Sequence, residues 1–423
     1  MKIKMNEISY LKRIFQAYYK QKKHEIPLVN LFNQREFGFI PWDKMVMIRH
    51  KHFNESEDFK NYLINNPPKH VYSSGTLYNN PGNPNMNEKG FLGCDFLIDI
   101  DVDHFFTPCK NYHDLWYCKD CDKSGKGMPP NKCPKCGKNK FQSISWICQD
   151  CLNVAKNEIL KLVNDFLIPD FGIEENELKI SFSGHRGYHL KIANEKIRTL
   201  SSSERREIVD YLTGDNISYD ILGLDDLSSD LGLLDQNIGW SQKIIIRIKY
   251  LLRNYTNDVL VEILRQEKFG LNTEIIEYIL NNKESFLKTL WNVKGLGFKT
   301  WHNFLEGIIK EVGAEIDKPV SIDIHRLIRY PGSLHGKTGF KVQQLSLKEL
   351  EDFNPLDEKN HDIDPIIYFS EDENLKEYKV IEKVIPAIKI KGETFGPYKK
   401  DEIITIPHHI AVFLLCKEVV KMI

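Results

Sequence analysis

The sequence predicts an α/β (α+β) protein with a core of mixed or antiparallel sheet, and three observations support this. Strand-like runs, such as FLIDIDV (96–102) and ELKISFSGHRGYHLKIA (177–193), alternate with helical patterns such as NVAKNEILKLVNDFL (153–167). Eight of the nine cysteines lie between Cys94 and Cys151, which indicates a separate metal-binding module. The pattern from about 200 to 312 is mostly helical and indicates an inserted helical region.

These composition changes predict the domain organisation. We expect a core formed by residues 1–104 and 153–345, interrupted by a module at 105–152 and a helical insertion at about 200–312. The polar stretch EDFNPLDEKNHDIDP favours a linker at 346–375, before a small β-rich domain at 376–423. Within the core we expect a helix and then strands between His24 and His50. Over 315–342 we expect a strand, a helix and a Pro-Gly loop.

The overall charge excludes few function classes. Lys and Arg number 58 and Asp and Glu number 59, so net charge does not indicate a nucleic-acid partner, and any such contact needs a local basic surface. The N-terminal residues lack the apolar run of a signal peptide. A membrane span needs about 20 consecutive apolar residues, and no stretch of the sequence approaches that length. We therefore expect a cytoplasmic protein.

Two aspartates in the strand-like run LIDID are the first candidate site residues. Side chains at i and i+2 of a strand share a face, so Asp99 and Asp101 point the same way. Two carboxylates among apolar neighbours repel each other unless a cation neutralises them, which favours a divalent metal. The alternative is a strand end where acids reach solvent, and we interpret Asp95 and Asp103 in that way.

The motif SGHRGYH places an arginine, two histidines and a hydroxyl around two glycines. Glycine allows the backbone to approach a ligand closely, and the guanidinium of Arg186 suits phosphate. An ordinary hairpin with exposed Arg and His side chains is the alternative.

The cysteines favour structural zinc over free thiols, because KCPKCGK is typical of a zinc knuckle and thiolates suit tetrahedral Zn²⁺. The simplest grouping gives two sites: Cys118, Cys121, Cys133 and Cys136 for one, and Cys109, His113, Cys148 and Cys151 for the other. Cys94 and Cys416 lie among apolar residues and are interpreted as core cysteines.

Taken together, the motifs LIDID, SGHRGYH and the segment from Asp317 to Gly339 resemble, in this order, the small subunit of archaeal and eukaryotic DNA primases. REFGF (35–39) and MIRH (47–50) are also similar to that family, and the resemblance covers roughly residues 30–345. It implies a primase-type core, and the set that contains Cys109 and His113 resembles the family's zinc element. The set that begins with Cys118 would then belong to an inserted ribbon.

The resemblance implies the role of each site residue. Asp99, Asp101 and Asp317 would bind two Mg²⁺ or Mn²⁺ ions. Asp323 is a rival for the third position, although we expect it to cap the helix of HRLIRY. The implied nucleotide-binding residues are Ser183, Arg186, His189, Arg329, His335, Lys337 and, with less regular spacing, Glu36 and Arg49.

The implied activity is template-directed synthesis of short primers from nucleoside triphosphates. Implied partners are single-stranded DNA and a primase large subunit. The tail resembles the small domain of archaeal GINS subunits, which implies docking of other replisome proteins; the alternative is a β-domain packed on the core. Two rival functions remain: a repair or translesion polymerase, or a primase-polymerase, with the same core, and a non-catalytic zinc-bearing nucleic-acid adaptor.

Overall fold

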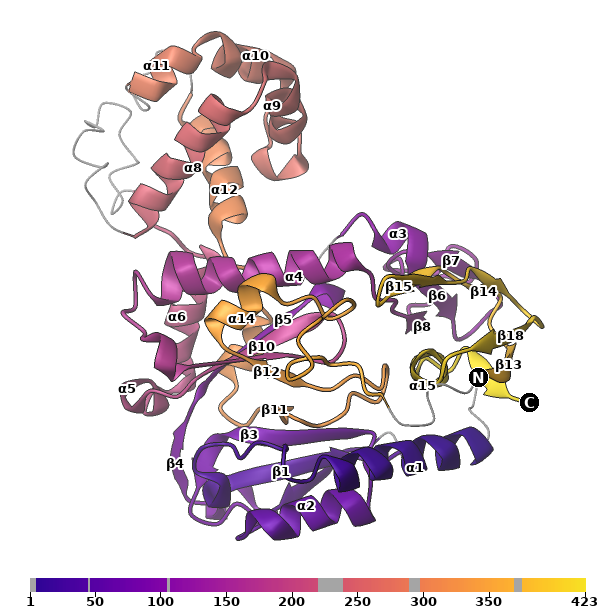
Figure 1. Cartoon of the computed structure of the whole chain (residues 1–423). Coiled ribbons are helices and arrows are strands. Elements are labelled where there is room, and N and C mark those ends of the chain that lie inside the picture. The colour runs from indigo at the N-terminus through magenta and orange to yellow at the C-terminus, as the bar shows by residue number, and fades with distance from the viewer. Residues whose placement is uncertain (1–4, 45, 105–106, 220–238, 289–296, 369–374) are drawn as a thin grey trace. The chain divides into compact units, whose positions relative to one another are not determined.

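The computed structural model describes residues 5–44, 46–104, 107–219, 239–288, 297–368 and 375–423 (Figure 1). The chain forms two compact units. The first, here called the sheet unit, comprises Met1–Leu160, Glu174–Arg205 and Ile316–Ile423. The second, the helical unit, comprises Lys161–Ile173 and Arg206–Glu315.

The first sheet of the sheet unit has five antiparallel strands. They are ordered β11 (Leu327–Arg329), β3 (His70–Tyr78), β1 (Arg35–Ile40) and β2 (Ile48–Lys51), and β4 (Phe91–Cys94) also pairs with β3. Aromatic side chains of β1 pack on helix α2 (Ser56–Asn65), since the rings of Phe37 and Phe59 lie 4.9 Å apart. This packing gives the first sheet its own apolar core.

The second sheet has four antiparallel strands, ordered β12 (Gln343–Leu345), β9 (Leu178–Phe182), β10 (Gly187–Ile192) and β5 (Phe96–Asp101). Its apolar residues Ile98, Ile100 and Leu190 are buried. In the register of β10 and β5, His189 lies opposite Asp99. Directly opposed residues share a face, so both strands direct polar side chains to the same side.

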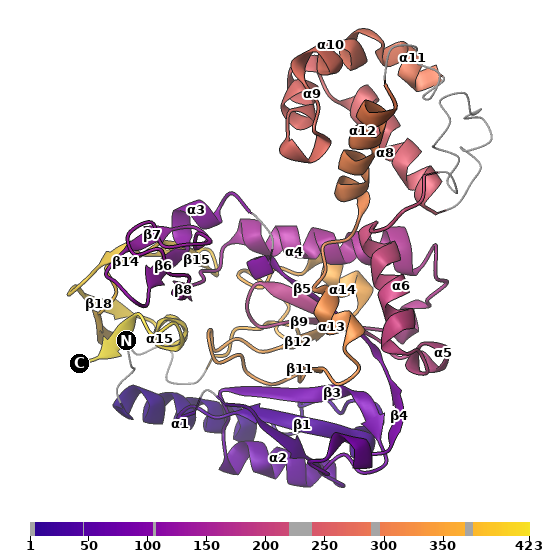
Figure 2. The same ribbon diagram turned by 180° about the vertical axis from the view of Figure 1, so that it is seen from behind.

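Helices flank the two sheets, as both ribbon views show (Figures 1 and 2). The first sheet lies beside α1 (Met5–Gln21) and α2, and α4 (Gln149–Lys161) runs along the second sheet. Shorter helices connect the strands of this unit: α5 (Glu195–Arg198), α13 (Lys318–Ile322) and α14 (Leu347–Asp352).

The cysteine-rich segment forms α3 (Lys110–His113) and a three-stranded ribbon of β6 (Leu115–Cys118), β7 (Ser124–Lys126) and β8 (Phe141–Ile144). Both elements belong to the sheet unit.

The C-terminal segment is β-rich and ends beside a buried helix. Its sheet is ordered β18 (Ile403–Ile406), β13 (Lys376–Val380) and β19 (Val420–Met422). Two further strand pairs are β14 (Val384–Ile385) with β17 (Tyr398–Lys399), and β15 (Ile388–Ile390) with β16 (Glu393–Phe395). Helix α15 (His408–Cys416) is buried along most of its length, and Phe413 packs 5.6 Å from the rings of both Trp146 and Phe340. This segment therefore shares its core with the rest of the sheet unit.

The helical unit is built around amphipathic helices with buried apolar residues such as Ile244, Leu260 and Trp301. It contains most of α6 (Ser202–Thr213) and all of α8 (Trp240–Asn254), α9 (Asn257–Leu264), α10 (Thr273–Asn281), α11 (Lys283–Lys288) and α12 (Phe298–Val312). Within the described ranges, no helix combines the length and the apolar character needed to cross a bilayer.

Several local expectations need correction. The first helix is α1, and residues 24–31 form no helix. Over 315–342 the helix precedes the strand, because Pro319 lies in the first turn of α13, and Leu327–Arg329 of HRLIRY pair with β3 as β11. Asp323 therefore ends a helix. The described part of the expected linker packs against the core, since Leu350 and Phe353 are buried.

Candidate active site

Three aspartates from distant parts of the chain lie near one edge of the second sheet. Asp99 and Asp101 are on β5, and the backbone N–H of Asp317 donates to the carbonyl of Asp99 at 2.9 Å. This bond places the start of α13 beside β5. The rival Asp323 is exposed, and its carboxylate accepts a bond from the N–H of His325 at 2.8 Å, as in a local turn.

The negative charges of the aspartates affect one another's pKa values. Burial, and then the negative charges of Asp101 and Asp317, raises the pKa of Asp99 to about 7. Burial, and then the charge of Asp103, also raises the pKa of Asp101. Among the described residues, only the two cysteine clusters bring three or more metal-ligating atoms within 4.8 Å of one another, so these carboxylates are spaced more widely.

A cleft of about 150 Å³ lies between this carboxylate edge and β11 with its following loop. Acidic residues line one part and basic residues another. The polar and charged lining residues are Tyr72, Asp99, Asp101, Asp103, Ser183, His185, His189, Arg326, Arg329, His335 and Lys337. The cleft therefore joins an acidic site to a basic one.

The SGHRGYH motif forms the turn between β9 and β10. Gly184 has a φ of +81°, and a Cβ there would lie 2.7 Å from the Cβ of His335, so only glycine fits this contact. The Nε2 atom of His189 lies 3.5 Å from Asp99 Oδ1. Burial, and then the charge of Arg329, lowers the pKa of His189 to about 3, so its ring is neutral. Its buried Nδ1 atom has no partner within the described structure.

The motif predicts that Arg186 binds phosphate directly, but the structure pairs its guanidinium with carboxylates of the protein. Its guanidinium is buried, donates from Nε to Asp103 at 2.7 Å, and donates from one terminal nitrogen to both oxygens of Asp114 at 2.8–2.9 Å. That nitrogen also donates to the carbonyl of Trp146. Two carboxylates thus already accept hydrogen bonds from most of the Arg186 N–H groups. Arg186 therefore holds the turn in place through Asp103 and Asp114.

Arg329, His335 and Lys337 lie on the basic side of the cleft. Arg329 NH1 lies 2.7 Å from His70 Nδ1, and its guanidinium lies over the ring of Tyr72. The side chain of Lys337 is exposed. These residues line one cleft with the β5 aspartates, as the motif pattern predicts.

Glu36 and Arg49 lie outside the cleft lining. Glu36 is fully buried and accepts bonds from Arg49 Nε and Lys89 Nζ, both at 2.8 Å. Burial alone would raise its pKa, but these bonds lower the pKa of Glu36 below its usual value. The expectation that Asp95 is a strand-end acid in contact with solvent was wrong, because Asp95 is fully buried and pairs with Arg35 at 2.6 Å and Arg198 at 2.7 Å.

Five cleft or near-cleft residues were not assigned to the site from the sequence: His70, Tyr72, Asp103, His185 and Arg326. His70 and Tyr72 lie in the β3 run HVYSSGTLY, whose alternation gives no indication of which strand it pairs with. Pairing of β11 with β3 puts Tyr72 opposite Arg329. Only this long-range pairing makes them site residues.

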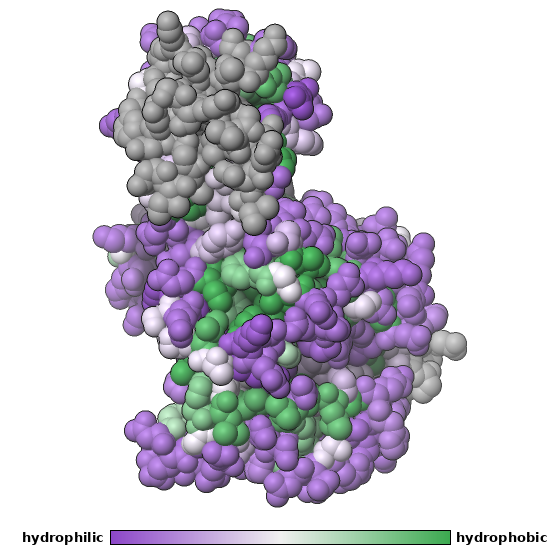
Figure 3. Space-filling view, turned by 90° about the vertical axis from the view of Figure 1, so that its left-hand side faces the viewer, coloured by the Kyte–Doolittle hydropathy of each residue, from purple (hydrophilic) through white to green (hydrophobic). Residues whose placement is uncertain are grey.

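A second cavity, of about 220 Å³, adjoins the cleft between the two sheets. It shares His189 and Arg329 with the cleft, and its other lining residues include Leu28, Val29 and Lys191. The space-filling view shows apolar surface on the sheet unit bordered by hydrophilic residues (Figure 3). The lining of this second cavity mixes apolar residues with basic side chains such as Lys179 and Lys191.

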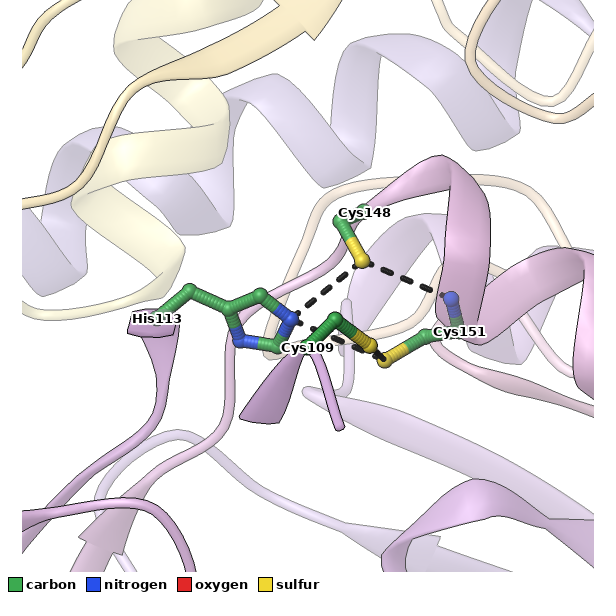
Figure 4. Close-up of side chains that lie close together, drawn as sticks. All are labelled: Cys109, His113, Cys148 and Cys151. Carbon is green, nitrogen blue, oxygen red and sulfur yellow. Dashed lines mark hydrogen bonds between the residues drawn. The ribbon is translucent and has the colours of Figure 1, made fainter. Parts of the chain in front are cut away.

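The cysteines form the two clusters predicted from their spacing. In the first cluster, Sγ of Cys109 and Cys151 lie 3.2 Å apart, and His113 Nε2 lies 3.2 Å from Cys148 Sγ (Figure 4). In the second cluster, the sulfurs of Cys118 and Cys136 lie 3.5 Å apart, and those of Cys121 and Cys133 lie 3.6 Å apart.

Each cluster offers four ligand atoms within 4.8 Å of one another, and every cysteine is a free thiol. Four S or S/N donors are what tetrahedral Zn²⁺ requires. Both clusters could bind zinc. The two remaining cysteines, Cys94 and Cys416, are buried as predicted.

Comparison with known proteins gives one consistent result. Residues 131–344 match the family model described as DNA primase small subunit. The chain is 31% identical to the DNA primase small subunit PriS of Methanosarcina mazei and 32% identical to that of Methanosarcina acetivorans, each match covering 97% of this chain and 96% of the relative. It is 26% identical to the PriS of Nitrosopumilus maritimus, over 98% of this chain and 99% of that one. The mixed α/β core, the acid-and-base cleft, the two cysteine clusters and these full-length matches together show that the chain belongs to the DNA primase small subunit family.

Proposed function

We propose that this cleft joins nucleotides by metal-dependent nucleotidyl transfer, producing primers on a DNA template. The observation that supports the proposal most is the composition of the cleft. Asp99 and Asp101 line it with Arg329, His335 and Lys337, and Asp317 is bonded to the Asp99 backbone. Phosphoryl transfer needs both an acidic metal site and positive charge for the phosphates.

Asp99, Asp101 and Asp317 are proposed to hold divalent cations, with Mg²⁺ or Mn²⁺ the metals that suit carboxylate ligands. The raised pKa of Asp99 supports this assignment, because burial and the charges of Asp101 and Asp317 outweigh the nearby Arg329 and Arg326. When bound, the cations would neutralise these carboxylates and lower the pKa of the attacking 3′-hydroxyl.

The protein's own groups bind and orient the nucleotide. Arg329 and Lys337 are placed to attract the triphosphate, and the ring of Tyr72 and Nδ1 of His70 fix the direction of the Arg329 guanidinium. The neutral ring of His189 lies beside Asp99, where it can exchange hydrogen bonds with a phosphate or a ribose hydroxyl. Ser183 lines the same cleft.

The proposed partners follow from this reaction and from the family name. Single-stranded DNA would be the template, nucleoside triphosphates the substrates, and a primase large subunit the protein partner. Structural zinc is proposed for both cysteine clusters, since neither has an open ligand position among its four donors. Docking of other replisome proteins by the C-terminal segment remains a prediction from its resemblance to GINS.

The test is incubation of the purified chain with single-stranded DNA, Mg²⁺ or Mn²⁺ and labelled nucleotides, with and without the large subunit. We expect labelled dinucleotides and short primers from free nucleotides, and none from the Asp101→Asn variant. Extension of a supplied primer without any synthesis from free nucleotides, even with the large subunit present, would favour a repair polymerase. Wild-type yield from a folded Asp101→Asn variant would remove the basis of the proposal.

A further inference from the structure

The C-terminal segment directs one buried lysine to the turn beside the cleft. Lys417 follows α15, and its Nζ atom lies 2.6 Å from the carbonyl of Ser145 and 2.8 Å from His185 Nε2. The Nζ atom also lies 5.6 Å from the ring centre of Phe413 and 6.0 Å from that of Trp146. A residue near the C-terminus therefore contacts the SGHRGYH motif directly.

His185 transmits this contact to the cleft. Its ring stacks on the ring of His335, with centroids 5.3 Å apart and an angle of 10° between the planes. The His335 ring in turn lies 4.9 Å from His70, which is bonded to Arg329. A continuous row of side chains therefore runs from Lys417 to the guanidinium proposed to bind phosphate.

The neighbouring residue gives the same segment a second attachment. Glu418 forms an ion pair with Lys69 at 3.4 Å. The Lys69 side chain packs against Gly336, where an added Cβ would lie 2.1 Å from Lys69 Cγ. Because Gly336 lies between His335 and Lys337, Lys417 and Glu418 reach this loop by two routes, through His185 and through Lys69.

The charges around Lys417 favour the binding of an anion nearby. Burial, and then the positive charges of Arg186 and Lys337, lowers the pKa of Lys417 well below its usual value. In the described part of the chain, no carboxylate forms an ion pair with its Nζ atom. The negative charges of Asp103 and Asp114 offset part of this positive charge, and a polyanion in the adjacent cleft would offset more of it.

We propose that Lys417 is a positioning residue for nucleotide binding: it holds His185, and through the stacked ring His335, at the phosphate side of the cleft. The inference rests on the proposed function, since it assumes that the cleft binds a triphosphate. It makes the C-terminal segment part of nucleotide binding. Deletion of residues 376–423 would therefore impair catalysis, contrary to the expectation for an independent docking module.

The test compares the full-length variants Lys417→Met, Lys417→Arg and Lys400→Met. Lys400 is an exposed lysine of the same segment and serves as the matched control. Primer elongation is measured over a range of nucleotide concentrations, and binding of inorganic tripolyphosphate is measured by calorimetry. We expect Lys417→Met to raise the KM for nucleotide by about tenfold, the effect of one lost charged hydrogen bond, with a smaller change in kcat. Tripolyphosphate should bind more weakly by the same factor, Lys417→Arg should recover part of the loss, and Lys400→Met should behave as wild type.

A folded Lys417→Met enzyme with an unchanged KM and unchanged tripolyphosphate affinity would overturn the proposal, even if its melting temperature fell. His185→Phe provides a second route, because phenylalanine keeps the stack on His335 and removes the bond to Lys417. The double variant should be no worse than either single variant; additive effects would show that the two residues act separately. Absence of elongation by the wild-type chain would instead contradict the proposed function, and the tripolyphosphate measurement separates the two cases.

Discussion

The two cysteine clusters use similar ligands but differ in how they connect to the cleft. In the first cluster, His113 Nδ1 lies 2.8 Å from Asp114, and Asp114 also accepts bonds from Arg186 and from the N–H of Trp146. In the second cluster, Cys136 is exposed, and the surrounding lysines, such as Lys119, Lys132 and Lys140, are exposed as well. The first cluster is thus connected to the active-site turn, while the second lies on a peripheral ribbon.

This difference shows that similar ligand sets can have different consequences. A carboxylate behind a ligating histidine fixes the ring and its tautomer. Here the same carboxylate also neutralises Arg186, so one residue serves both the cluster and the turn. The ribbon has its own three-stranded sheet, and the partners of Arg186, which are Asp103, Asp114 and Trp146, lie outside its strands.

The largest expected effect comes from breaking the first cluster with Cys151→Ser. Cys151 is fully buried. Structural zinc contributes about 10–16 kcal/mol in small domains, as much as a whole domain's stability of about 5–15 kcal/mol. We expect little folded protein and no primer synthesis, as measured by circular dichroism and nucleotide incorporation. A stable, active variant that still contains two zinc ions would contradict the ligand assignment.

A smaller effect is expected from Asp114→Asn, which keeps the side-chain shape and removes the charge. Losing one partner of a buried ion pair costs about 3–5 kcal/mol, although Asp103 still pairs with Arg186. Loss of a carboxylate behind a zinc ligand weakens metal binding by about 10–100-fold. Thermal unfolding and the rate of zinc loss to a chelator should both change. If only one of them changed, the cluster and the turn would not be linked through Asp114.

The smallest effect is expected from Cys133→Ser in the second cluster. Metal analysis should show one zinc ion instead of two, because one of the four thiolates is lost. Nucleotide addition to a supplied primer should stay within about twofold of wild type, as for changes away from the site. Ser143→Ala, on an exposed part of the ribbon, is the control. Loss of nucleotide addition here would show that the ribbon also supports catalysis.

Local sequence patterns predicted those parts of the site that depend on neighbouring residues. The alternation in LIDID placed Asp99 and Asp101 on one face, and the cysteine spacings gave the two groups that the structure brings together. The turn between β9 and β10 was also predicted, because two strand-like runs flank a glycine-containing motif.

Other parts depended on long-range contacts that no local pattern encodes. HRLIRY has no strong preference, and its pairing with β3 decided that it is a strand. The burial of Asp95 and the ion pairs of Arg186 follow from acids and bases far apart in the chain. Lys417 lies 232 residues from His185, so only the folded core reveals their contact.

The most direct test of the active-site assignment compares Asp317→Asn with Asp323→Asn in single-turnover primer elongation. Both variants lose one negative charge from the same segment, but only Asp317 contacts β5. The account predicts a loss of about 10³-fold or more for Asp317→Asn, the scale of removing an essential catalytic group, and wild-type elongation for Asp323→Asn. Full activity of a folded Asp317→Asn enzyme, or loss of activity in Asp323→Asn alone, would contradict it.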